Sequence, residues 1–335
     1  MSVHGSAGLP VLKEALSYEF RDPLRGPSWC ARLVRAKSAS VLILSKQGQS
    51  RTGLRRGVIM QDAEFCGDSA PRKFFWDIGT AGSTTMLALT VLPIAAFAKK
   101  PCVFRIRGGL FQDFAPSAFH TQEVLLPALR EMGLEVELRI LRPGYVPKGG
   151  GEIELRVNPL SGPLKPLRRL ELQNPLKFWG ISLASHLRER KVAERMAQRC
   201  QEELSRRGIA AEFHILHDDT APQPGAALAL FAEDQNRSRL GADQAGAPGR
   251  PAERIAEFVA QSLLEDRQTG ATVDRHLADQ LILFCALAKG ESAFRIPSFT
   301  DHVEANLWLV EELLGAKWEL SGNLLRIQGV GYAQS

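Results

Sequence analysis

The sequence has few cysteines, and their spacing fits neither a zinc site nor a disulfide framework. The 5 cysteines are odd in number, and no two of them form a Cys-x-x-Cys pair. A zinc-binding module and a disulfide-stapled secreted domain are therefore disfavoured, and a reducing cytoplasm is the expected location.

Long apolar runs are missing as well. The longest, Met86 to Ala98, is too short to span a bilayer and ends in Lys99-Lys100. The first residues do not combine a basic region with an apolar stretch. We therefore expect neither a membrane span nor a secretory signal.

The composition is that of an ordinary globular protein. Apolar residues make up 44% and charged residues 24% of the 335 positions, which is enough chain for two domains. The net charge of +5 suits a polyanionic partner. Basic clusters such as Arg51/Arg55/Arg56 and Arg105/Arg107 could meet phosphates, or they could simply form solvated surface.

The first part of the chain, residues 1–72, gives few periodic signals. Pro10 to Ser17 is compatible with a short helix and Ser40 to Leu44 with a strand. From Phe75 onward the pattern sharpens, and a glycine-rich turn beginning at Asp77 opens a helix predicted over 83–97 and interrupted at Pro93. Such a turn either holds an anion or lets the helix pack closely on a sheet.

Two later segments share one plan of helix, glycine and strand pair. The first begins at His120 and reaches its glycine at Gly133, and the second begins at His302 and reaches Gly315. Strands are predicted over 135–141 and 152–157 in the first copy and over 323–328 in the second. This self-similarity predicts an α+β fold in which one helix–sheet unit is used more than once.

A different segment lies between the two copies. It predicts strands over 178–183, 211–216 and 226–231, a helix over 190–207, and a second helix from Pro251 to about Glu265. We therefore predict a small α/β domain, 175–271, inserted into a large domain formed by 1–174 and 272–335.

The turn from Pro143 to Gly151 contains three consecutive glycines flanked by Lys148 and Glu152. Such a run is costly in backbone entropy unless a tight turn or a close approach requires it. The sequence therefore predicts a structural or binding role for this turn.

The stretch from His276 to Asn306 holds the best candidate for chemistry. An amphipathic helix starts at His276, and a loop then delivers His302 to the first turn of a helix that runs to about Leu314. Asp301 is the expected N-cap, with Glu304 completing a capping box. A helix N-terminus favours a neutral, nucleophilic imidazole and offers free amides to a phosphate, although His302 could equally be an ordinary surface residue.

Taken together, these motifs resemble the RNA 3'-terminal phosphate cyclase family over about Phe75 to Tyr332. The residues that carry the resemblance are Asp77-Ile-Gly-Thr-Ala-Gly-Ser-Thr, Arg107-Gly-Gly with Ala115-Pro116, Gly144-Tyr-Val-Pro-Lys-Gly-Gly-Gly-Glu152, His276-Leu-Ala-Asp-Gln280, and Thr300-Asp-His302 with Asn306. The resemblance implies a large domain of three βαβαββ-like repeats, the first divergent, with a smaller inserted α/β domain.

The resemblance also implies chemistry. ATP would adenylylate His302 with Mg²⁺ or Mn²⁺ present, AMP would pass to the 3'-phosphate of an RNA, and the 2'-hydroxyl would close a 2',3'-cyclic phosphate. The family motifs place His276, Asp279, Gln280 and Pro116 at the nucleotide. Echoes of the family's arginine segments at Arg35, Arg55 and Arg107 imply contacts to RNA phosphates, and no metal ligands are assigned.

The sequence departs from the family pattern before residue 90. Gly5-Ser6 is followed by Ala7-Gly8-Leu9-Pro10 and not by the family's acidic glycine loop, and Leu89 stands where the family usually has a glutamine. These departures keep a second interpretation open, in which the chain is a non-catalytic cyclase-like protein that binds RNA and assists ribosomal RNA processing.

Overall fold

The structure, a computed structural model, describes residues 17–19, 29–36, 39–46 and 71–333. The first three ranges are strands β1 (Ser17–Glu19), β2 (Trp29–Ala36) and β3 (Ala39–Lys46), which form an antiparallel sheet in that order. Strand β3 confirms the strand predicted at Ser40 to Leu44. The helix predicted at Pro10 to Ser17 lies outside the described residues except for Ser17.

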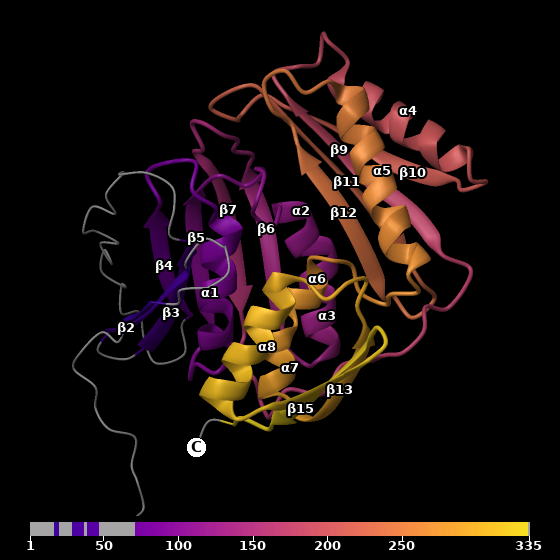
Figure 1. Cartoon of the computed structure of the whole chain (residues 1–335). Helices are drawn as coiled ribbons and strands as arrows, with labels where there is room; N and C mark the ends of the chain where they lie inside the picture. Colours follow the sequence, from indigo (N-terminus) through magenta and orange to yellow (C-terminus); the bar gives the residue numbers. More distant parts are fainter. Residues whose placement is uncertain (1–16, 20–28, 37–38, 47–70, 334–335) are drawn as a thin grey trace, which may run out of the picture.

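The first four-stranded sheet has the order β4-β5-β7-β6. Its strands are β4 (Arg72–Asp77), β5 (Cys102–Gly108), β6 (Val136–Arg142) and β7 (Gly151–Val157). The parallel pair β4 and β5 is joined by helix α1 (Thr84–Ala96), while β5, β7 and β6 are antiparallel. Alternate residues of the strands face the main hydrophobic core, so this sheet and α1 form one helix–sheet layer (Figure 1).

Helix α1 begins at the glycine-rich turn. The hydroxyl of its N-cap Ser83 accepts a hydrogen bond from the Met86 N–H at 3.1 Å. The helix continues through Pro93 to Ala96, so the predicted interruption is wrong. Because Pro93 falls in the last turn, its ring removes only one backbone hydrogen bond near the end of the helix.

The next helical segment contains a π-helical turn. Helix α2 (Ala118–His120) leads into the π-helical turn η1 (Thr121–Leu125) and then into α3 (Leu126–Glu131). The run confirms the helix predicted from about Ser117 to Met132. π-Helical turns inside helices are frequent at functional sites, and this one starts directly after the buried His120.

The predicted repeat is present. Helix α8 (Asp301–Leu314) ends at Gly315, and the antiparallel strands β14 (Lys317–Ser321) and β15 (Leu324–Val330) follow. In the first copy the helical run, Gly133 and the antiparallel pair β6 and β7 follow in the same order. Both glycines have positive φ, 96° and 72°, which lets the chain leave the helix in a left-handed turn.

The second copy belongs to a four-stranded sheet of order β14-β15-β13-β8, with β8 (Arg168–Arg169) and β13 (Lys289–Arg295). The two copies differ by one residue. The segment from the N-cap Ser117 to Gly133 is one residue longer than that from the N-cap Thr300 to Gly315. The additional residue falls between the N-cap and the histidine, because His120 and His302 both lie 13 positions before their glycines.

The segment between the copies forms its own sheet of order β10-β9-β11-β12. Its elements are β9 (Lys177–Ser185), α4 (Val192–Ser205), β10 (Ala211–Asp218), β11 (Gly225–Glu233), β12 (Arg239–Ala245) and α5 (Ala252–Gln268). Figure 1 shows α4 and α5 together on the outer face of this sheet. The predicted strands and helices are confirmed, and the exact domain boundaries stay a prediction.

The centre of this sheet, strand β11, is buried on both faces. On β11, Leu228 and Leu230 belong to the core under α4 and α5, whereas Ala229 and Phe231 belong to the main core of the rest of the chain. A strand buried on both faces has a continuous apolar sequence, as Gly225 to Glu233 does. The inserted segment therefore packs against the remainder of the protein. Within the described residues, no helix is both long and apolar enough to cross a bilayer.

Strands β12 and β13 are among the strands that the sequence did not predict. Strand β12 covers the first part of the Gly/Ala-rich stretch 241–249, and β13 begins shortly after helix α7 (Ile282–Leu287). Small residues are weak strand formers on their own. They are strand residues here because β12 pairs along its whole length with β11.

The glycine-rich turn 143–151 joins the two parts of the protein. The buried Tyr145 lies with its ring against Gly225, at the start of β11, and its hydroxyl is hydrogen-bonded to Ser185 at 2.9 Å. A Cβ on Gly150 would approach Pro222 of the same inserted segment to 2.9 Å. Of the two roles predicted for this turn, structural and binding, these contacts support the structural one.

The N-cap of helix α8 differs from the prediction. Thr300 is the N-cap, and its hydroxyl accepts a hydrogen bond from the Val303 N–H at 3.3 Å. Asp301 is already the first helical residue, so the predicted capping box is wrong by one position. Asp301 and Glu304 still favour the helix because both are acidic residues in its first turn.

The contact between Tyr145 and Gly225 predicts a packing constraint. We expect Gly225→Ala to destabilise the protein by about 1–3 kcal/mol, because Tyr145 is buried and hydrogen-bonded and cannot move away from a new methyl group. The midpoint of urea unfolding, followed by fluorescence, measures the change. Gly162→Ala is the control, since nothing lies within 4 Å of its Cβ position, and it should stay within about 0.5 kcal/mol. Equal midpoints for the two variants would contradict the contact.

The cap of α8 predicts a second difference. Thr300→Ala should cost about 0.5–2 kcal/mol, because the Val303 N–H loses its acceptor. Asp301→Ala should cost less than about 1 kcal/mol, because it removes only a charge near the helix start. Thermal unfolding of the two variants, measured side by side, distinguishes the two candidate N-caps. A larger loss of stability for Asp301→Ala than for Thr300→Ala would support Asp301 as the N-cap.

Candidate functional site

The candidate site is built on a short helix whose start is held by a buried carboxylate. Helix α6 (Leu277–Gln280) carries Asp279 and Gln280, and His276 directly precedes it. The Oδ1 atom of Asp274 accepts hydrogen bonds from the backbone N–H groups of His276 at 2.9 Å and Leu277 at 2.8 Å. These bonds satisfy free donors at the helix start, so the backbone that carries the candidate nucleotide-binding residues is fixed.

A buried histidine supports the same carboxylate. His120, at the end of α2, lies 3.0 and 3.1 Å from the two carboxylate oxygens of Asp274 through its Nε2 atom. Both side chains are almost fully excluded from solvent. The ring of His120 also meets the ring of His276 edge to face, with centroids 5.8 Å apart and planes at 86°.

His302 occupies the first turn of α8 and is exposed, while α6 and α8 pack against each other. The carboxylate of Asp279 lies within electrostatic reach of both His302 and His276. Burial raises the pKa of Asp279, and the two imidazoles oppose that shift. The structure therefore brings together His302, His276 and Asp279, three of the residues that the sequence singled out.

The inserted segment supplies one wall of the site. Asp243 on β12 is surrounded by protein, and burial raises its pKa although His120, His276 and a hydrogen bond from Ser117 act in the opposite direction. The Gly241 N–H, also on β12, donates to Asp274 Oδ2 at 2.9 Å. The site therefore lies where the inserted sheet meets α2 and α6.

For the other candidate residues, the structure either shows no direct contact with His302, His276 or Asp279 or does not describe the side chain. Gln280 Oε1 is buried and has no hydrogen-bond partner among the described residues, so it is a vacant acceptor beside the histidines. Pro116 precedes the α2 cap, and its carbonyl accepts a hydrogen bond from the Thr85 hydroxyl at 2.5 Å. Arg107 lies on β5, 3.6 Å from Asp77. The side chain of Arg35 on β2, and the whole of Arg55, lie outside the described residues.

Three residues of the site were missed from the sequence: His120, Asp243 and Asp274. Asp274 carried a usable signal, because an aspartate shortly before a helical Leu-Ala-Asp-Gln run is a typical capping residue. His120 was noted only as the start of a repeat. Asp243 lies in the Gly/Ala-rich stretch 241–249, and its proximity to the other site residues arises from the packing of the inserted sheet.

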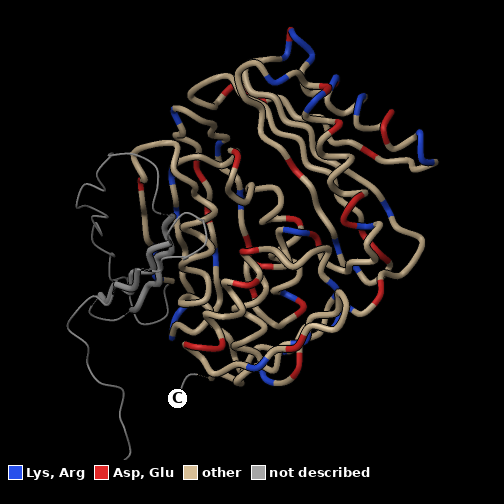
Figure 2. Tube along the Cα trace, in the orientation of Figure 1, with Lys and Arg blue, Asp and Glu red and all other residues tan. Residues whose placement is uncertain are grey.

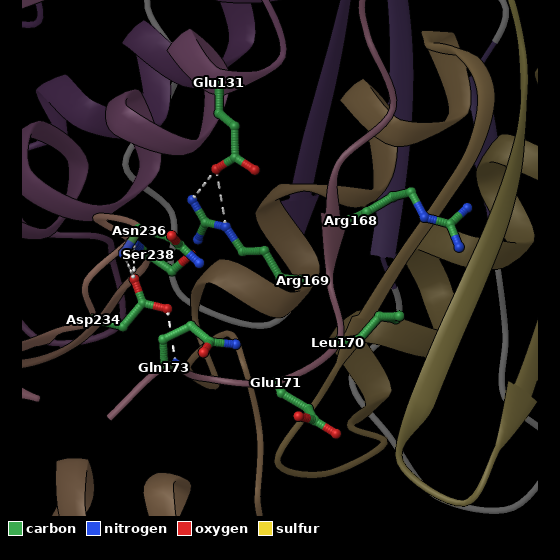
Figure 3. Close-up of a pocket in the computed structure, with 9 residues that line it drawn as sticks. All are labelled: Glu131, Arg168, Arg169, Leu170, Glu171, Gln173, Asp234, Asn236 and Ser238. Carbon is green, nitrogen blue, oxygen red and sulfur yellow. Dashed lines mark hydrogen bonds and ion pairs between the residues drawn. The ribbon is translucent and has the colours of Figure 1, made fainter. Parts of the chain in front are cut away.

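A separate polar cavity lies between the two parts of the protein, with a volume of about 560 Å³. Figure 3 shows the residues that line it: Glu131, Arg168, Arg169, Leu170, Glu171, Gln173, Asp234, Asn236 and Ser238. The buried Arg169 donates to Glu131 at 2.7 Å, and the Asp234 carboxylate accepts from the backbone N–H groups of Gln173 and Ser238. Of these bonds, the one from the Gln173 N–H to Asp234 joins the two parts. None of the described candidate residues lines the cavity.

The geometry permits nucleophilic chemistry at His302. Its imidazole is accessible at a helix N-terminus, where free amides and the helix dipole stabilise a phosphate. The neighbouring side chains of His120 and Asp274 are shielded from solvent. Among residues 71–333, no group of three or more His, Cys, Asp or Glu side chains is arranged to hold a metal ion.

Comparison with known proteins identifies the family of the chain. The sequence profile of the RNA 3'-terminal phosphate cyclase family matches residues 61–320. The protein of Pyrobaculum aerophilum named RNA 3'-terminal phosphate cyclase is 32% identical over 316 residues, which is 89% of this chain and 89% of that protein. The protein of the same name from Pyrococcus furiosus is 37% identical over 250 residues, 74% of this chain and 71% of that protein. Since the profile and the relatives cover most of the sequence, the chain belongs to the RNA 3'-terminal phosphate cyclase family.

Proposed function

We propose that this protein converts the 3'-terminal phosphate of an RNA to a 2',3'-cyclic phosphate at the expense of ATP, with His302 as the nucleophile. The observation that carries the proposal is the exposed imidazole of His302 in the first turn of α8, beside Asp279 and His276 on the fixed start of α6. The family membership and the names of the relatives supply the reaction class.

The first step forms a bond between a ring nitrogen of His302 and the α-phosphorus of ATP. The bond from that phosphorus to the bridging oxygen breaks, and pyrophosphate leaves. Free amides at the start of α8 stabilise the negative charge on the α-phosphate during the transfer. Mg²⁺ is usually held by substrate phosphates together with few protein ligands, so we propose that Mg²⁺ or Mn²⁺ enters with ATP.

The later steps use the RNA end as both nucleophile and electrophile. An oxygen of the 3'-phosphate attacks the AMP phosphorus, and the bond to His302 breaks, which restores the imidazole. The neighbouring 2'-hydroxyl then attacks the 3'-phosphorus, loses its proton, and displaces AMP. In this scheme His276 stacks on adenine, Asp279 and Gln280 accept hydrogen bonds from the nucleotide, and Pro116 forms part of the base pocket.

The cytoplasm is the proposed location. The three cysteines within residues 71–333, Cys102, Cys200 and Cys285, are free and buried. Thiols of this kind persist in a reducing compartment.

One observation favours a different function. Leu89, where the family usually has a glutamine, is partly buried on α1 and packs against the main core. That position therefore contributes packing and offers no polar group to a substrate. On this reading the chain is a cyclase-like RNA-binding protein without catalytic activity that assists ribosomal RNA processing, and the adenylylation test below separates the two functions.

Incubation with ATP labelled at the α-phosphate tests the covalent step. We expect acid-labile, alkali-stable label on the wild-type protein with Mg²⁺ or Mn²⁺, and none on His302→Ala. His214→Ala is the matched control, because His214 is also an exposed histidine but lies on β10 of the inserted sheet. It should retain full labelling. Label that persists on His302→Ala would refute the assignment, and no label on any folded protein would favour the RNA-binding alternative.

Binding of RNA should weaken as salt rises, because phosphate contacts release counterions. Lys and Arg alternate with Asp and Glu along the described chain (Figure 2), so a few local contacts are expected to carry this dependence. We expect Arg107→Ala to reduce the slope of log K against log salt by about 0.7, the contribution of one phosphate contact to a single strand.

Arg139→Ala is the matched control, because Arg139 lies on β6 of the same sheet and pairs with Glu137 at 2.8 Å. Fluorescence anisotropy of a labelled RNA with a 3'-phosphate gives the slopes. An unchanged slope for Arg107→Ala would show that Arg107 does not contact a phosphate.

A further inference from the structure

Asp274 joins three segments that are distant in the sequence. Its Oδ1 atom accepts the N–H groups of His276 and Leu277 at the start of α6, and its Oδ2 atom accepts the Gly241 N–H of β12. His120 Nε2 bridges both oxygens. One buried carboxylate therefore fixes the helix run that begins at α2, the nucleotide helix α6 and the inserted sheet relative to one another.

A carboxylate with only donors around it is held in its ionised form. Burial by itself raises the pKa of Asp274, but the charge and hydrogen bond of His120 and the backbone N–H of Leu277 lower it to about 2. An ionised group that is fully buried requires a partner of opposite charge, since the cost of desolvation is otherwise too high. Among the side chains bonded to Asp274, His120 is the one that can carry a positive charge.

The surroundings of His120 favour that charge. Burial lowers its pKa, but Asp274, Asp243 on β12 and Asp279 on α6 outweigh burial, and the pKa is raised on balance. Two other titratable groups lie near His120 and its three carboxylates. His276, beside α6, contacts the His120 ring, and His302 on α8 interacts electrostatically with Asp279. The His120 Nδ1 atom is buried without a hydrogen-bond partner among the described residues, so its N–H in the imidazolium has no acceptor there, which opposes the charge that the three carboxylates favour.

We propose that His120 is a positioning residue of the nucleotide site, which acts as a buried imidazolium that holds Asp274 and thereby fixes α6 against the inserted sheet. His120 is excluded from solvent and acts through Asp274 and through the edge of the His276 ring. It occupies the repeat position that corresponds to His302, so the same helix start carries an exposed nucleophile in one copy and a buried charge in the other. The functional part of this proposal rests on the proposed function.

The pH window of the pair follows from the two shifts. The contribution of His120 to stability is fully present below its ordinary pKa of about 6.5 and is lost as pH rises through its raised folded value. The contribution of Asp274 is present above about pH 3.9 and is lost as pH falls through its lowered value of about 2. Both contributions are therefore fully present between about pH 3.9 and pH 6.5. The ion pair is lost on the alkaline side as His120 loses its proton, and on the acid side as Asp274 gains one.

The charge can be read directly from the ring nitrogens. Histidine ¹⁵N NMR on the full chain at pH 7 should show one imidazolium whose signals are missing in His120→Gln. This measurement requires no activity and no nucleotide. Chemical shifts of a neutral imidazole at this position would overturn the proposal, whatever the enzyme does.

The positioning role is tested by two further readouts. In His120→Gln, which keeps a donor but loses the charge, we expect the KM for ATP in adenylylation to rise about tenfold or more with kcat unchanged, because α6 holds the nucleotide and not the reacting nitrogen. His120→Leu should in addition speed amide exchange over 274–281 and 239–245. His217→Gln is the control, since it removes a histidine–carboxylate pair of 3.2 Å with Glu194 in the inserted segment; its KM and exchange should match wild type.

Each outcome is decisive. A KM for ATP in His120→Gln that equals wild type, or a loss confined to kcat, would overturn the positioning role. If wild-type protein forms no adenylate, the proposed function fails, while the imidazolium signal and the exchange over 274–281 still decide the proposal for His120. If His120→Leu does not fold, the comparison rests on His120→Gln and on the wild-type spectrum.

Discussion

The fold around the site depends on the burial of one negative charge. Asp274 lies fully inside the protein, and each of its two oxygens accepts hydrogen bonds from groups on different elements. Removing such a carboxylate, or its cationic partner, leaves the other charge buried and unpaired, which typically costs about 3–5 kcal/mol. The start of α6, the end of α2 and the edge strand β12 are therefore held together by one interaction, and the candidate nucleotide-binding residues take their positions from it.

A second constraint is the double burial of the inserted sheet. Its outer face packs under α4 and α5, and its inner face joins the main core through residues such as Ala229 and Phe231. The ring of Tyr145 against Gly225 and the hydrogen bond from the Gln173 N–H to Asp234 hold the same boundary at two other places. Asp243 and Gly241 can therefore serve the site although they belong to the insertion, because the sheet that carries them packs directly on the rest of the protein.

Much of this architecture could be predicted from local patterns in the sequence. The repeat was predicted because helix, glycine and strand pair follow one another at short range, and both glycines adopt the positive φ that their positions require. The location of His302 in a first helical turn was predicted for the same reason. The cap was misplaced by one residue because Thr300 and Asp301 are both good N-caps, and only the backbone geometry selects Thr300.

The buried part of the site could not be predicted from the sequence. The bond between His120 and Asp274 joins residues 154 positions apart, and no local periodicity reports such a pair. Strand β12 was missed because its small residues become strand-forming only through pairing with β11. The glycines of the 143–151 turn were recognised, but their role in docking depended on residues of the inserted segment, such as Pro222 and Gly225.

The central claim is that His302 carries AMP during the reaction. The most direct measurement is mass spectrometry of the intact protein after incubation with ATP and Mn²⁺, followed by fragmentation that locates the adduct. The account predicts a single added AMP, bound to a ring nitrogen of His302. An adduct on another residue such as His276, or a protein that binds ATP and remains unmodified, would contradict it.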